Sequence, residues 1–91
     1  MNPVRAFQYV YVLQNESGLT YTGCTNDLKK RFAEHQSGKS EYTKKRGPYD
    51  LVYYEACLNK DDAYRRERYL KTGMGKRYIK NRLKSHFGKE L

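Results

Sequence analysis

Three segments of the chain carry the side-chain patterns of β-strands. Residues 7–14 alternate β-favouring side chains, with three aromatic residues and Leu13 on one face and two valines between two glutamines on the other. Turn-forming residues 15–18 separate this segment from a second extended segment, 19–23, so we expect a hairpin whose register the sequence leaves open. Residues 51–54 are moderately hydrophobic on both faces and predict a third strand.

A first helix is predicted after the hairpin. Thr25 or Asn26 can cap it, Asp27 lies favourably at the positive end of its dipole, and Leu28 and Phe32 would anchor it before it stops near Gly38. The polar and basic segment 39–48, which contains a Gly-Pro pair, predicts a loop.

Two further helices are predicted in the second half. One begins at residues 59–62 and stops near Gly73, and the other spans about 76–87 with Ile79, Leu83 and Phe87 as its anchors. The order ββαβαα predicts an α+β fold, in which helices pack on a three-stranded, mainly antiparallel sheet. At 91 residues we expect one domain over 1–91, with its core at about residues 6–87.

The net charge of the chain indicates which kind of partner it would bind. Nineteen Lys and Arg against ten Asp and Glu give a formal net charge of +9, and ten tyrosines are interleaved with it. A basic surface with aromatic side chains suits phosphates and bases, so composition favours a nucleic acid over a ribosome or an acidic membrane. No segment is apolar enough to span a membrane or resembles a signal peptide, so a cytoplasmic protein is expected.

Cysteine and histidine are too sparse for a zinc or disulfide framework. Cys24 and Cys57 predict small, buried, reduced side chains, and His35 and His86 cannot form a multi-histidine cage. A magnesium site built from carboxylate, phosphate and water remains open.

Three polar residues on two of the predicted helices are candidates for a functional role. Arg31 and His35 are four residues apart and share a helix face, and spacing alone favours a solvated pair. Glu67 falls in the inward stripe of the second helix, with Ala63, Leu70 and Met74 as its other members. A buried carboxylate needs a partner, either an arginine such as Arg31 or a divalent cation that arrives with a substrate phosphate, and spacing leaves both open.

These residues, in this order, resemble the GIY-YIG nucleases over almost the whole chain. The motif halves are Tyr9-Val10-Tyr11 and Tyr21-Thr22-Gly23, followed by Arg31, His35, Glu67 and Asn81. The chain departs from the family name at three positions, with Tyr9 for glycine, Val10 for isoleucine and Thr22 for the second isoleucine. It is most similar to the short standalone branch, which lacks the additional DNA-binding domains of the homing endonucleases and of the excision-repair nuclease subunit.

The resemblance implies a role for each matching residue. Tyr11 would help to activate the water, Tyr21 would position water or phosphate, and Arg31 would bind the scissile phosphate. Glu67 would be the one acidic ligand of a Mg²⁺ or Mn²⁺ ion, His35 would take a catalytic position that the family fills with histidine or tyrosine, and Gly23 and Asn81 would support the site. Either Tyr11 or His35 could be the general base. A free tyrosine has a pKa of ~10, so Tyr11 would need a nearby cation, or His35 as a relay, to act as a base at neutral pH.

The expected activity is metal-dependent hydrolysis of DNA with low sequence specificity, selective for DNA shape and linked to DNA repair or processing. RNA stays open as a substrate, and a monomer or a weak homodimer is expected. The alternative is a non-catalytic DNA- or RNA-binding module of the same fold. Candidate phosphate contacts are the basic residues Lys44, Lys45, Arg46, Arg66, Lys76 and Arg77.

Overall fold

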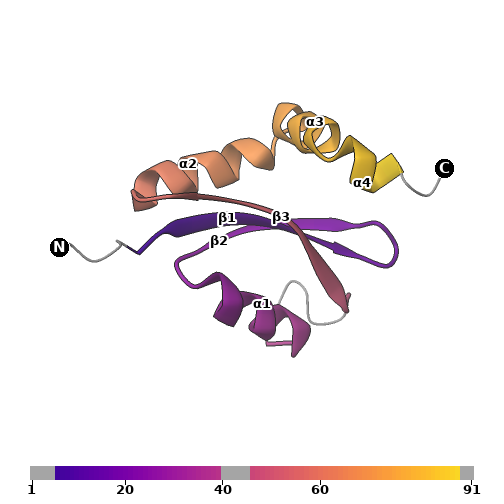
Figure 1. Ribbon diagram of the computed structural model, residues 1–91, viewed down its shortest axis with the longest axis horizontal. Helices are drawn as coiled ribbons and strands as arrows, with labels where there is room; N and C mark the ends of the chain where they lie inside the picture. Colours follow the sequence, from indigo (N-terminus) through magenta and orange to yellow (C-terminus); the bar gives the residue numbers. More distant parts are fainter. Residues whose placement is uncertain (1–5, 40–45, 89–91) are drawn as a thin grey trace.

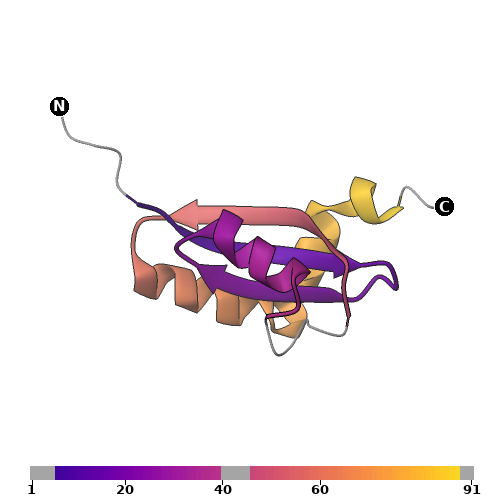
Figure 2. The same ribbon diagram turned by 90° about the horizontal axis from the view of Figure 1, so that it is seen from below.

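The computed structural model describes residues 6–39 and 46–88 as a three-stranded sheet between two layers of helices (Figure 1). The strands are β1 (Gln8–Asn15), β2 (Thr20–Thr25) and β3 (Tyr49–Cys57), and the helices are α1 (Leu28–Gln36), α2 (Lys60–Leu70), α3 (Gly73–Arg82) and α4 (Lys84–Gly88). Helix α1 covers one face of the sheet, and α2 and α3 cover the other (Figures 1 and 2). The α+β architecture and the predicted element order are confirmed, with α4 as an addition.

The sheet has the order β2-β1-β3, and both of its strand pairs are antiparallel. The hairpin register left open by the sequence places Tyr11 opposite Gly23 and Leu13 opposite Tyr21. Because the first strand is central, its two alternating sets of side chains are both buried. β2 is an edge strand of the sheet, and helix α2 packs against it.

Two hydrophobic clusters, one on each face of the sheet, hold the layers together. Tyr11, Leu13 and Tyr49 form the cluster beneath α1. On the opposite face a second cluster is formed by the buried residues Val10, Val12, Ala63, Leu70 and Ile79. The alternation of aromatic residues and valines along β1 therefore assigns each set of side chains to a different layer.

The first helix and the third strand differ from their predicted boundaries. Asp27, rather than Thr25 or Asn26, is the N-cap of α1, and its carboxylate accepts a hydrogen bond from the Lys30 backbone N–H. This position satisfies an orphan donor and keeps the negative charge at the positive end of the helix dipole. Strand β3 continues for several residues on both sides of the predicted 51–54 because it pairs with the whole length of β1.

The junction between α2 and α3 corrects the predicted inward stripe. Helix α2 ends at Leu70, and Gly73 lies inside the next helix instead of only stopping the previous one. The new helix changes the phase of the pattern, so Met74 is 65% exposed and Gly75 is buried in its place. A side chain at Gly75 would overlap the backbone of Tyr69 and Leu70, which explains how closely the two helices approach.

The predicted last helix is divided at Leu83 into α3 and α4, and it starts earlier than expected. Its three predicted anchors all face the core, with Ile79 buried and Leu83 and Phe87 partly buried against it. Most of the predicted loop 39–48, including Lys44 and Lys45, lies outside the described residues. None of the helices that the structure describes has the length and apolar character needed to cross a bilayer.

Candidate active site

Tyr11 is the centre of the candidate site, and its side chain is only 1% exposed. Its hydroxyl lies 2.8 Å from Nε2 of His35, which projects from α1 onto the same face of the sheet. His35 is also buried, so the solvated Arg–His pair favoured by spacing alone is wrong for the histidine. Packing α1 over β1 converts a surface position on an isolated helix into an interior one.

Gly23 provides the space that the Tyr11 ring needs. The two residues face each other across the hairpin, and a Cβ atom at position 23 would overlap both the hydroxyl oxygen and Cζ of Tyr11. Only glycine leaves room at this position of β2 for the ring and hydroxyl of Tyr11.

Tyr21 completes a group of three rings at this edge of the sheet. Its ring centroid lies 6.3 Å from that of Tyr11 and 5.0 Å from that of His35. Because Tyr21 pairs with Leu13, it shares the α1 face with Tyr11. The hairpin and the first helix thus bring together three residues that are separated by up to 24 positions in the chain.

Arg31 and burial set the protonation states of the group. Burial raises the pKa of Tyr11 to about 12, and the nearby Arg31 guanidinium opposes this rise through hydrogen bonding and charge. Burial, together with the same Arg31 charge, lowers the pKa of His35. At neutral pH the pair is therefore a protonated tyrosine and a neutral histidine, joined by one hydrogen bond.

Arg31 has hydrogen-bonding capacity beyond its ion pair with Glu34. Its Nη1 pairs with Glu34 at 3.0 Å, one turn along α1, and its side chain remains one-third exposed. A guanidinium has five N–H donors, so the Glu34 pair leaves others for an anion.

Glu67 reaches the group from α2, which packs against the edge strand β2. Its side chain is 18% exposed and pairs with Lys71 Nζ at 3.2 Å, so the partner that the sequence left open is a lysine on the same helix. The negative charge of Glu67 contributes to the raised pKa values of both Tyr11 and Cys24. Lys71 lies 5.9 Å above the Tyr21 ring, which links the carboxylate to the tyrosines.

The donor set around Glu67 suits a cation that is shared with a substrate. Among residues 6–39 and 46–88, no group of three or more His, Cys, Asp or Glu could enclose a metal ion. One partly exposed carboxylate, which like Arg31 affects the pKa of Tyr11, matches the way Mg²⁺ is held, by one or two carboxylates, water and substrate phosphate.

The remaining predicted site residues that the structure describes are exposed or bind another side chain. Asn81 is exposed on α3, as are Lys76 and Arg77, and Arg46 is exposed before β3. Arg66 binds both carboxylate oxygens of Glu55 at 2.9 Å. Its guanidinium also lies over the rings of Tyr69 and Tyr78. Both thiols are free, as the sequence predicts, but they are partly rather than fully buried.

Sequence reasoning missed the charged partners Glu34 and Lys71. Each lies three or four positions from its partner on the same helix, so the helical spacing rule for ion pairs could have identified both. Neither has a recognisable motif of its own.

Comparison with known proteins decides the family. The model of the GIY-YIG catalytic domain matches residues 7–78, which include Tyr11, Tyr21, Arg31 and Glu67. The chain belongs to the GIY-YIG family. The resemblance found in the two motif halves is thereby confirmed.

Relatives of this GIY-YIG chain include small proteins of the UPF0213 group. A UPF0213 protein from Clostridium perfringens is 47% identical over 64 residues, which cover 69% of each chain. One from Staphylococcus haemolyticus is 43% identical over 68 residues, covering 74% of this chain and 83% of the relative. The solution NMR structure of a UPF0213 protein from Bacillus halodurans is 38% identical and superposes with a TM-score of 0.51, covering 80% of this chain and 81% of that one.

Proposed function

We propose that this GIY-YIG protein is a metal-dependent endonuclease that hydrolyses phosphodiester bonds of DNA. The observation that carries the proposal is the buried Tyr11–His35 hydrogen bond of 2.8 Å, placed beside an arginine and a carboxylate. A module that only binds nucleic acid needs neither a buried proton-transfer pair nor a carboxylate at its phosphate site. The net charge of +9 supplies the attraction for a polyanion.

Arg31 is the residue that would bind the scissile phosphate. Its partly exposed guanidinium can donate charge-assisted hydrogen bonds to a phosphate oxygen while it keeps Glu34 as a partner. These bonds would stabilise the negative charge that builds up on the equatorial oxygens in the transition state.

Tyr11 and His35 would together take the proton of the attacking water. With a pKa of about 12, the Tyr11 hydroxyl is protonated at neutral pH and cannot act as a base alone. Neutral His35 can accept that proton at Nε2 as the tyrosine oxygen takes one from the water. The hydrogen bond and the raised pKa of Tyr11 support a relay over a free tyrosinate, and Tyr21, whose ring is tilted relative to those of Tyr11 and His35, would position the water or phosphate.

Glu67 would hold a divalent cation, either Mg²⁺ or Mn²⁺. When bound, such an ion supplies Lewis-acid stabilisation of the phosphate and of the leaving oxygen. In the structure the Glu67 carboxylate forms an ion pair with Lys71.

Cleavage of end-labelled DNA tests the proposal. Duplex, nicked, branched and single-stranded substrates would be incubated with and without Mg²⁺ or Mn²⁺. We expect metal-dependent cutting that Glu67→Gln and Tyr11→Phe each reduce by about 10²-fold or more, the usual range for loss of a proton-transfer group or a metal ligand.

Matched variants away from the site serve as controls. Glu16→Gln and Tyr64→Phe make the same chemical changes at exposed positions and should leave the rate unchanged. If the wild-type protein binds every substrate and cuts none with either metal, the nuclease proposal fails and the chain is a binding module.

A further inference from the structure

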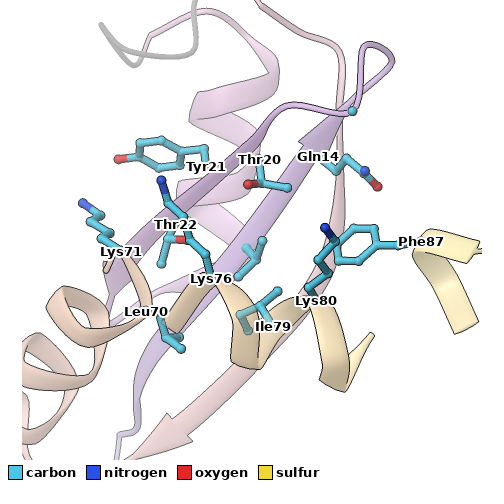
Figure 3. A pocket seen from close by; sticks show the side chains of 12 residues that line it. Gln14, Thr20, Tyr21, Thr22, Leu70, Lys71, Lys76, Ile79, Lys80 and Phe87 are labelled. Atoms are coloured by element: carbon cyan, nitrogen blue, oxygen red, sulfur yellow. The ribbon is translucent and has the colours of Figure 1, made fainter. Parts of the chain in front are cut away.

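A groove of about 690 Å³ lies between the β1–β2 hairpin and the helices α2, α3 and α4. Figure 3 shows Tyr21 and Lys71 at one end and Phe87 of α4 at the other. Both Tyr21 and Lys71 contact the candidate active site, so the groove opens directly from it. Its volume falls within the range of about 300–1,000 Å³ that is typical of sites for small molecules.

Two kinds of surface line this groove. Its floor is apolar and includes Val12 and Ile79, and the partly buried ring of Phe87 forms its far wall. Lysines line it as well, and Lys71, Lys76 and Lys80 are all exposed. In Figure 3, Lys76 extends toward Tyr21, whereas Lys80 lies beside the Phe87 ring.

The far wall of the groove is fixed in place. The ring nitrogen Nε2 of His86 lies 3.0 Å from Oε1 of Gln14, and this contact ties α4 to the end of β1. Phe87 itself packs against the core beneath α3, and its backbone N–H bonds to the carbonyl of Leu83. The aromatic surface is therefore preformed, which lowers the entropic cost of binding.

We propose that this groove binds one unpaired base of the DNA strand next to the scissile phosphate. The inference rests on the proposed function, because the groove and the candidate active site share Tyr21. The base would lie on the apolar floor and contact the Phe87 ring. Lys76 and Lys80 would bind the flanking phosphates. The threonines of β2 that line the groove offer hydroxyls to the edge of the base.

The chemistry of the lining distinguishes this occupant from others. Three cationic side chains around an apolar floor suit a flat aromatic group that carries phosphates, and they do not suit a neutral apolar ligand. A base inside a duplex has both faces stacked and would first have to leave the helix, which costs free energy. DNA with an unpaired nucleotide at the cleavage position is therefore the preferred substrate.

Binding measured in EDTA tests the groove separately from catalysis. The probe is a labelled DNA duplex with a short unpaired stretch that contains 2-aminopurine, compared with the fully paired duplex and with a probe that is abasic at the same position. We expect the unpaired probe to bind about tenfold tighter than the paired one and its fluorescence to be quenched. The abasic probe should bind about 5- to 100-fold more weakly, as base–aromatic stacking predicts.

Variants locate the binding to the groove. Phe87→Leu should weaken binding of the unpaired probe by a similar factor and leave binding of the abasic probe unchanged. Lys80→Gln, an exposed change that spares the core, should weaken both and lower the salt dependence by about one phosphate contact. Lys84→Gln, one turn later and outside the groove lining, is the matched control and should have an affinity within about twofold of wild type.

The outcomes separate this inference from the proposed function. Equal affinity for the unpaired and abasic probes, or equal losses in the Lys80 and Lys84 variants, would overturn the groove site even if the protein cuts DNA. Selective, base-dependent binding by a protein that cuts no DNA would support the groove and refute the nuclease.

Discussion

Replacing Gly23 with alanine tests how the hairpin register builds the active site. The new methyl would overlap the Tyr11 hydroxyl and lie only 2.5 Å from Cζ, while His35 and α1 confine the ring from the other side. Overpacking of this kind costs about 1–3 kcal/mol. Disturbing the buried Tyr11–His35 hydrogen bond adds about 1–3 kcal/mol.

Part of this cost is offset, because alanine is favoured over glycine in a strand by about 0.5–1 kcal/mol. We therefore expect a net loss of about 1–5.5 kcal/mol in the free energy of unfolding. Activity should fall by about 10²-fold, since displacing a reacting group by 1 Å has effects of that size.

A double-mutant cycle measured by urea unfolding isolates the contact. Tyr11→Leu removes the overlapping atoms, so Gly23→Ala should be less costly in that background by at least about 1 kcal/mol. Gly73→Ala is the control, because no heavy atom lies within 4 Å of its Cβ position, and it should be neutral or slightly stabilising. If the cost of Gly23→Ala is the same with and without the Tyr11 ring, the steric explanation is wrong.

Three further results are expected. Since the pKa of His35 is lowered, cleavage activity should fall only as pH drops below about 6.5, and His35→Gln should remove that acidic limb from the pH–rate profile; an unchanged limb excludes the relay. The raised pKa of Tyr11, about 12 against ~10 when unfolded, contributes stability below pH ~10 that is lost between pH ~10 and ~12; because burial also raises the pKa of Tyr53 to about 12, urea titration at each pH should show a smaller loss in Tyr11→Phe than in wild type, and an equal loss would contradict this. Arg66→Ala should lower the unfolding free energy by about 1 kcal/mol by removing the ion-pair partner of Glu55, which keeps the hydrogen bond from Tyr53, yet leave the salt dependence of DNA binding as in wild type; a reduced slope would show that Arg66 contacts phosphate.

The sequence by itself determined the fold class and the family. The two faces of β1 were readable because side chains of a strand alternate, and the stripes of the helices were readable because their period is fixed. The two motif halves and the ordered polar residues were enough to identify the family. These features are local or follow from order along the chain, so they need no knowledge of packing.

Only the tertiary structure decided where helices change phase and which polar groups are buried. Gly75 replaces Met74 at the interface because a new helix begins at Gly73 and lets two backbones approach closely. His35 follows the spacing of a surface residue but is buried once α1 packs over Tyr11.

The pairing of charged side chains also depended on the tertiary structure. Arg66 belongs to a basic run of the sequence, and the structure binds it to Glu55, which lies 11 positions earlier on another element. Burial and pairing are consequences of which elements meet in space. Periodicity along one element carries no information about them, so the protonation of Tyr11 and His35 could be assigned only from the packed fold.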